Sequence, residues 1–122
     1  MNDHYAAILP CLMMNCRSVY NKVDNLNEML NTIGPSVSIL SETWEREKQK
    51  LDAVVKNKQF GIISYYRKNK APGGGCAIIY DKNRFRATDP EIIVPNNVEA
   101  VWSVLSRLLS ISLKNSHVES QI

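Results

Sequence analysis

The stretch AAILPCLMM, residues 6–14, is apolar almost without interruption, which is typical of a strand covered on both faces. Apolar residues then recur at helical spacing over residues 23–33, after Ser18, which we expect to cap that helix. Gly34-Pro35 ends the helical pattern, and a second apolar run follows at residues 37–40. This succession predicts a β-α-β unit, in which a right-handed crossover makes the two strands parallel neighbours.

Shorter elements are predicted in the rest of the chain. Residues 45–55 favour a short helical or irregular segment. The apolar runs 60–66 and 76–80 are typical of strands, and the polar, glycine-rich loop between them indicates a long hairpin connection. Apolar residues alternate over residues 98–105, which predicts a half-buried antiparallel strand, and residues 108–113 are a weaker candidate for one more.

Length and composition exclude several classes of protein. The chain has 122 residues, 44% of them hydrophobic and 22% charged, which is ordinary for one globular domain and excludes disorder as the main interpretation. No apolar run approaches the ~20 residues of a membrane-spanning helix, and the N-terminal residues lack the pattern of a signal peptide. We therefore expect an intracellular protein, in the nucleus if it acts on DNA.

Three cysteines, Cys11, Cys16 and Cys76, are the only ones in the chain. They form no Cys-x-x-Cys pair, and neither histidine lies at zinc-ligand spacing from them. We therefore expect three buried free thiols and no disulfide framework or structural zinc site.

Basic residues gather in one segment of the chain. The net charge is +3, and eight of the 15 lysines and arginines lie between residues 46 and 70, the basic segment. Such a run is typical of a solvated helix face that continues into a loop. The alternative is a surface that faces the phosphates of a nucleic acid, since clustered cations are the electrostatic mark of such binding.

Polar residues follow both strands of the predicted β-α-β unit. Asn15 comes directly after the first apolar run, and Glu42 comes after the second. Ligands of α/β sheets bind beyond the carboxyl ends of the strands. A carboxylate there can hold Mg²⁺, which takes few protein carboxylates and keeps several waters, and an amide beside it can orient that carboxylate. The alternative for each residue is a turn or capping role.

Two other features favour structural roles. The glycine triplet at residues 73–75 precedes a strand and not a helix, and it lacks the lysine of a phosphate-binding loop, so a flexible turn is favoured. Trp44 and Trp102 are expected in the core or in a pocket wall.

Three motifs together resemble a known family. Asn-Cys-Arg-Ser at residues 15–18, Ser-Glu-Thr-Trp at 41–44 and Gly-Gly-Gly-Cys-Ala-Ile at 73–78 occur in this order. They resemble the opening half of the endonuclease/exonuclease/phosphatase family, most of all the endonuclease domains of non-LTR (LINE-type) retrotransposons. The resemblance extends over residues 8–105.

The resemblance implies a fold and a reaction. The fold would be α/β, a partial four-layer α/β sandwich in which two sheets pack face to face with helices outside. The reaction of the family is Mg²⁺-dependent hydrolysis of a phosphodiester, and in retrotransposons it nicks the target DNA. By position, Glu42 matches the metal-binding glutamate of the family and Asn15 matches the asparagine that supports it, so the two are the candidate catalytic residues.

The chain also departs from the family pattern. We expect it to lack the family's Asp-x-Asn pair and its late Ser-Asp-His, and His117 has no preceding aspartate. Residues 1–106 would then be the N-terminal part of the domain, truncated on the C-terminal side, and residues 107–122 a divergent or disordered tail.

Two functions remain open from the sequence, besides a pseudogene product without function. The first is a fragment of a Mg²⁺-dependent DNA endonuclease, inactive alone. The second is a non-catalytic remnant that binds nucleic acid or another partner through the basic segment. In either case DNA phosphates are the expected partner, and strands left without their neighbours would favour self-association.

Overall fold

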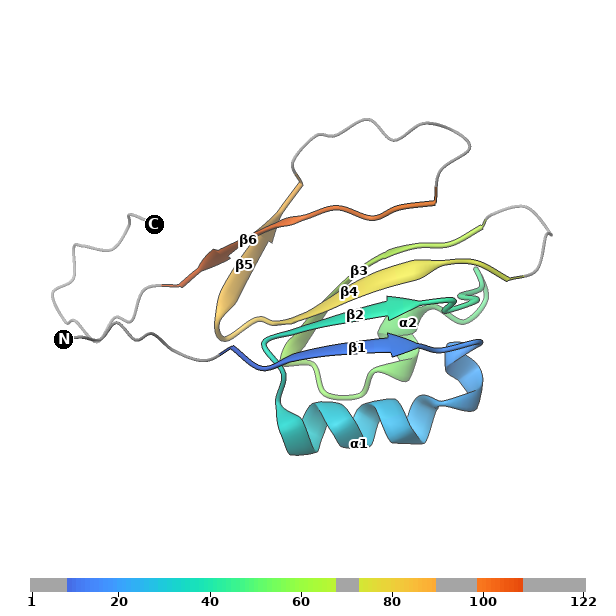
Figure 1. Cartoon of the computed structure of the whole chain (residues 1–122), viewed down its shortest axis with the longest axis horizontal. Coiled ribbons are helices and arrows are strands. Elements are labelled where there is room, and N and C mark those ends of the chain that lie inside the picture. Colours follow the sequence, from blue (N-terminus) through green and yellow to red (C-terminus); the bar gives the residue numbers. More distant parts are fainter. Residues whose placement is uncertain (1–8, 68–72, 90–98, 109–122) are drawn as a thin grey trace, which may run out of the picture.

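The structure, a computed structural model, describes residues 9–67, 73–89 and 99–108 (Figure 1). Four strands form one sheet in the order β1-β2-β4-β3, and β5 and β6 form a second, two-stranded sheet. None of the helices in these ranges is long and apolar enough to cross a membrane. The elements are β1 (Cys11–Asn15), the 3-10 turn η2 (Val19–Asn21), α1 (Val23–Ile33), β2 (Val37–Ser41), α2 (Leu51–Val54), β3 (Phe60–Tyr65), β4 (Cys76–Asp81), β5 (Phe85–Thr88) and β6 (Val104–Arg107).

The predicted β-α-β unit is confirmed. Strands β1 and β2 are parallel neighbours, with Asn15 opposite Ser41, and α1 connects them and ends at Gly34. The start of the helix differs from the prediction. The turn η2 separates Ser18 from α1, so Lys22 takes the N-cap position instead, and its Nζ donates to the carbonyl oxygen of Cys16 at 2.6 Å.

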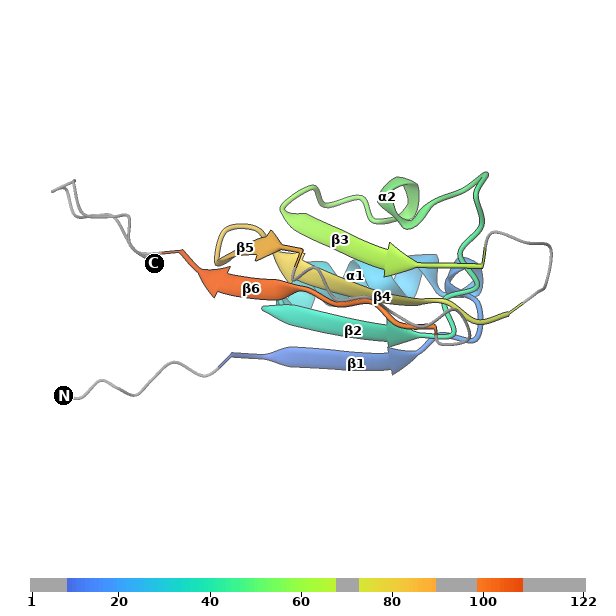
Figure 2. The ribbon, with the colours of Figure 1, turned by 90° about the horizontal axis from the view of Figure 1, so that it is seen from above.

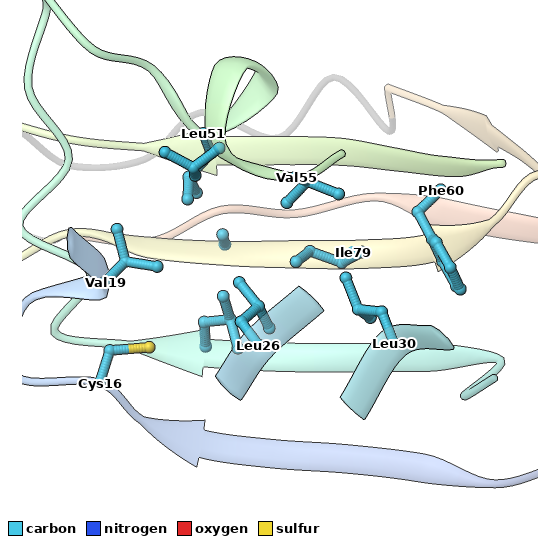
Figure 3. Packing of buried hydrophobic residues seen from close by; sticks show 11 residues of the cluster. Cys16, Val19, Leu26, Leu30, Leu51, Val55, Phe60 and Ile79 are labelled. Atoms are coloured by element: carbon cyan, nitrogen blue, oxygen red, sulfur yellow. The ribbon is translucent and has the colours of Figure 1, made fainter. Parts of the chain in front are cut away.

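The hydrophobic core lies between one face of the four-stranded sheet and both α-helices (Figure 3). Asn27 of α1 ties the two helices together, because its Nδ2 donates to the carbonyl of Val54 at 2.8 Å and its Oδ1 accepts from the N–H of Lys56 at 2.9 Å. The buried side chains are Cys16, Val19, Leu26, Leu30, Leu40, Leu51, Val54, Val55, Phe60, Ala77 and Ile79.

The second sheet lies on the other side of the four-stranded sheet, away from α1 (Figures 1 and 2). Helices, sheet and second sheet therefore follow one another as layers, which agrees with a partial α/β sandwich. Strand β5 was not predicted. It pairs with β6 at residues 104–107, whereas the predicted strand at 98–105 is wrong in its bounds, since residues 99–103 form no strand.

The side of the four-stranded sheet opposite the helices carries an apolar row. Register aligns Met13 with Ile39, Ile39 with Ile78 and Ile78 with Ile63, so that one side chain from each strand lies in this row. The second sheet does not cover its β1 end, where Met13 is 77% exposed and Ile39 is 46% exposed. This apolar row is therefore open to solvent at one edge.

Two expectations about burial are wrong. Only Cys16 is a buried thiol, whereas Cys11 is exposed on edge strand β1 and Cys76 is half-buried. Burial raises the pKa of the Cys16 thiol, against the opposing effect of the Lys22 ammonium. Trp44 and Trp102 are exposed and lie outside the core, because each follows a strand end or an irregular segment and not a core-facing strand position.

Candidate functional site

Asn15 and Glu42 lie at the same edge of the sheet, where β1 and β2 end. The loops that follow these strands are joined by three backbone hydrogen bonds, in which the N–H groups of Cys16, Ser18 and Val19 donate to the carbonyls of Ser41, Glu42 and Thr43 at 2.8–2.9 Å. Both Asn15 and Glu42 are exposed to solvent. The parallel pairing therefore brings together the two polar residues that the sequence singled out.

Backbone strain is concentrated in these two loops. Within the described ranges, the non-glycine residues with positive φ are Arg17, Ser18, Glu42 and Trp44, at 46°, 84°, 52° and 56°. Each such residue costs of order 1–3 kcal/mol and persists only where its surroundings enforce it, which is a recurring property of functional sites. The strain marks this edge of the sheet as a candidate site.

The Glu42 side chain has a fixed partner. Its Oε1 accepts a hydrogen bond from the indole Nε1 of Trp44 at 2.9 Å. Trp44 is itself held from the other side, because its backbone N–H donates to the carbonyl of Gly74 at 2.8 Å and the N–H of Thr43 donates to that of Gly75 at 3.2 Å. The glycine triplet thus acts as a support for the loop that carries Glu42.

Glu99 and Arg67 flank the same glycine loop. One carboxylate oxygen of Glu99 accepts from the N–H of Gly75 at 3.2 Å, and the other accepts from Nε of Arg67. The Arg67 guanidinium, and next the Gly75 N–H, hold the pKa of the Glu99 carboxyl below its usual range. Sequence reasoning counted Arg67 only as a cation of the basic segment and did not single out Glu99, because the two residues lie 32 positions apart.

The side chains at this edge of the sheet could supply a magnesium ion with few protein ligands, so that water would fill most of its coordination shell. Within the described ranges, no group of three histidine, cysteine, aspartate or glutamate side chains is placed to share a metal ion. Mg²⁺ often takes one or two carboxylates and keeps the rest of its octahedral shell as water. Glu42 is exposed and offers a second carboxylate oxygen besides the one that Trp44 contacts, so it fits as the single protein carboxylate, with the Asn15 amide on the neighbouring strand.

An Asp-x-Asn triplet does occur, contrary to the expectation from the sequence, at Asp81-Lys82-Asn83. The structure places it at the opposite end of the sheet. Asp81 ends β4 next to Ser36, whereas Cys76 at the start of β4 lies opposite Ser41. Five residues of strand correspond to about 16 Å, far beyond a shared site with Glu42.

Asp81 has a structural role at that end. Asp81 is 3% exposed. Its carboxylate accepts from Nε2 of Gln59 at 3.1 Å and from the N–H of Asn83 at 2.9 Å, and Nε of Arg84 lies 3.4 Å away. These contacts close the turn between β4 and β5. The triplet is therefore not the family's catalytic pair.

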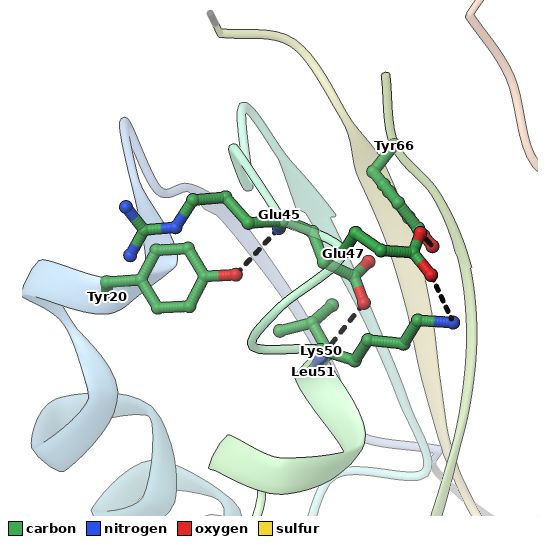
Figure 4. Close-up of polar contacts among 7 residues, drawn as sticks. Tyr20, Glu45, Glu47, Lys50, Leu51 and Tyr66 are labelled. Carbon is green, nitrogen blue, oxygen red and sulfur yellow. Dashed lines mark hydrogen bonds and ion pairs between the residues drawn. The ribbon is translucent and has the colours of Figure 1, made fainter. Parts of the chain in front are cut away.

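Most described cations of the basic segment contact other groups of the protein (Figure 4). Arg46 stacks on Tyr20 at 4.2 Å, and Lys50 lies 5.5 Å from the Tyr66 ring and 4.0 Å from Glu47. Lys58 donates to the carbonyls of Asp52 and Val55, and Arg67 pairs with Glu99. Four of its six described cations thus contact other groups of the chain, while residues 68 and 70 lie outside the described ranges.

A pocket of about 370 Å³ lies beside this segment and away from Glu42. One of its polar groups is Glu45, 6% exposed, whose Oε2 accepts from the N–H of Leu51 at 2.8 Å and so holds the start of α2. The pocket is lined by Glu45, Lys50, Asp52, Ile62, Ser64, Tyr65 and Tyr66.

Comparison with known proteins gives structural matches alone. No protein-family model and no curated protein sequence matches the chain. A 3′-phosphatase, NExo, from Neisseria, solved with a product DNA hairpin, matches with a TM-score of 0.59 and 12% identity over 81% of this chain and 38% of its own. An AP endonuclease from Archaeoglobus fulgidus matches with a TM-score of 0.54 and 15% identity over 66% of this chain and 30% of its own.

Each match covers only part of the length of the known protein. A 3′-5′ exonuclease from Neisseria meningitidis, with a TM-score of 0.50 and 13% identity, is likewise matched over 62% of this chain and 28% of its own. The chain spans less than two fifths of the length of each of these proteins. It therefore shares the mixed α/β fold of one part of the endonuclease/exonuclease/phosphatase nucleases.

Proposed function

We propose that this chain is the metal-binding part of a Mg²⁺-dependent DNA endonuclease of the non-LTR retrotransposon type. The observation that carries the proposal is the strained pair of loops at the ends of β1 and β2, which presents Glu42 beside Asn15. The matched NExo structure, which holds a DNA hairpin, supports DNA as the partner. Action on genomic DNA would place the protein in the nucleus.

Each residue of the proposed site has a task. Glu42 would hold the cation through the carboxylate oxygen that Trp44 does not contact, and Asn15 would orient the carboxylate or the water shell of the cation. A divalent cation bound there would polarise a phosphoryl oxygen and stabilise the charge that develops on it. Exposed loops and a single carboxylate favour a weakly held, water-rich cation.

The same residues do not activate water. The sequence contains no Ser-Asp-His, and its one Asp-x-Asn lies at the far end of the sheet. General acid–base assistance contributes about 10²–10⁴-fold to a hydrolytic rate. We therefore propose that the chain binds the cation but does not cleave DNA by itself.

A plasmid assay tests this proposal. With Mg²⁺, the purified chain should nick supercoiled plasmid no faster than the Glu42→Ala variant or a buffer control, because the sequence contains no Ser-Asp-His and its Asp-x-Asn lies at the other end of the sheet from Glu42. Nicking by the wild-type chain that disappears in Glu42→Ala would show that the chain is a complete enzyme and would contradict the proposed inactivity.

Binding of nucleic acid through the basic segment is a weaker candidate. It would depend on cations that are free to meet phosphates, whereas Arg46, Lys50, Lys58 and Arg67 contact other groups of the protein. Any such binding would be non-specific and would weaken steeply as salt rises.

A further inference from the structure

We propose that Glu99, paired with Arg67, is a positioning residue that sets the Glu42 carboxylate through the glycine loop at residues 73–75. This role rests on the proposed metal site at Glu42. The hydrogen bonds that connect Glu99 to the loop that carries Glu42 run through Gly75 and Gly74, so we expect the pair to act through this glycine loop.

The Glu99–Arg67 pair is in direct contact with the glycine loop. One carboxylate oxygen of Glu99 accepts a hydrogen bond from the Gly75 N–H, and the other forms an ion pair with Arg67. The side chains of Glu99 and Arg67 are 33% and 34% exposed. Gly74 and Gly75 have φ angles of 72° and 88°. A Cβ on Gly74 would overlap the Glu99 carboxylate and the Arg67 guanidinium, so no space separates the pair from the loop.

The glycine loop in turn holds the segment that carries Glu42. The carbonyls of Gly75 and Gly74 accept the backbone N–H groups of Thr43 and Trp44, and a Cβ on Gly75 would overlap the Thr43 hydroxyl. These bonds hold Trp44 at a φ of 56°, from which its indole reaches Glu42. A strained conformation needs such external support, and this support begins at Glu99.

Two variants separate positioning from simple charge. Removing a negative charge near a cation site weakens cation binding through electrostatics alone, and removing a positive charge strengthens it. Positioning predicts the same direction for both, so that Glu99→Ala and Arg67→Ala each weaken binding. Glu28→Ala is the matched control, because it removes one negative charge from an exposed position of α1.

Glu99→Gln tests the hydrogen bond further. The amide oxygen can still accept from the Gly75 N–H, while the ion pair with Arg67 is lost. We expect this variant to fall between the wild-type chain and Glu99→Ala, which a general loss of folding would not produce.

Two measurements on each full-length variant complete the test. The first, without metal, is hydrogen exchange of the backbone amides of Thr43, Trp44 and Gly75 by NMR. The second is Mn²⁺ affinity by water-proton relaxation, since Mn²⁺ prefers the same oxygen ligands as Mg²⁺. In Glu99→Ala and Arg67→Ala we expect exchange to rise about tenfold and Mn²⁺ affinity to fall about tenfold, the scale seen for groups that orient a metal ligand.

The outcomes are distinct. Unchanged exchange at the three amides in both alanine variants overturns the positioning role, whether or not the metal binds. Tighter Mn²⁺ binding in Arg67→Ala overturns it in favour of a charge effect. If wild-type chain binds no Mn²⁺ at Glu42 but the exchange rates rise as expected, the metal site fails while the loop support stands.

Discussion

Replacing Leu40 by alanine is expected to lower the free energy of unfolding by about 2–5 kcal/mol, because the lost methyl groups leave a cavity that the surrounding core fills only in part. Leu40 is a fully buried residue of β2, on the face of the sheet that the helices cover. Natural domains are stable by only about 5–15 kcal/mol. Equilibrium unfolding in urea, with the slope checked for constancy, measures the loss.

Ile39→Ala is the matched control for this variant. Ile39 is the neighbouring residue of the same strand but points to the opposite face and is 46% exposed. Its replacement should cost about 1 kcal/mol or less, the range of a partly exposed strand position. Equal losses in the two variants would mean that the helix-covered face is not the core.

The second large effect concerns association between copies of the chain. Met13 and Ile39 form the open end of the apolar row, and β1 pairs with β2 alone among the described strands, so it is an edge strand. Exposed apolar faces and free edges favour pairing with other chains. We expect the wild-type chain to associate as its concentration rises, and Met13→Lys with Ile39→Lys to weaken this association at least about 100-fold through like-charge repulsion.

Sedimentation equilibrium at several concentrations measures this effect. Asn25→Lys with Thr32→Lys is the matched control, since it places two lysines at exposed positions of α1 on the other side of the sheet. A wild-type chain that remains monomeric throughout, or a control that dissociates equally well, would contradict the assignment of the row as the contact surface.

The β-α-β unit and the β3–β4 hairpin were predictable because their signals are local. Continuous apolar runs, helical spacing and Gly34-Pro35 each act within a few residues. The structure reproduces most of these elements to within a few positions, although β1 begins only at Cys11, within the predicted run 6–14. The same locality explains why Asn15 and Glu42 could be placed at one edge, since parallel strands end at the same side of a sheet.

The second sheet was less accessible to sequence reasoning. Strand β5 has four residues with two exposed polar side chains, Arg86 and Thr88, so it carries no apolar run. Alternation near residues 98–105 indicated a pleated segment but not its partner. The strand that pairs with β5 spans residues 104–107 and not the predicted residues 98–105.

Contacts between distant residues escaped prediction altogether. Glu99 and Arg67 meet only because the hairpin and the segment before β6 converge on the glycine loop. The triplet at residues 81–83 has the letters of a catalytic pair, but the antiparallel register of β4 places it at the wrong end of the sheet. A short motif such as Asp-x-Asn therefore indicates a catalytic role only when it lies at the same end of the sheet as the other site residues.

Paramagnetic NMR with Mn²⁺ tests the central claim, a divalent-cation site at Glu42, most directly. Substoichiometric Mn²⁺ should broaden the Trp44 indole signal and the amides of Asn15 and Glu42 before signals of α1, and Glu42→Gln should abolish this selectivity while Glu28→Gln preserves it. Broadening that is uniform over the chain, or that is unchanged in Glu42→Gln, would contradict the proposed site.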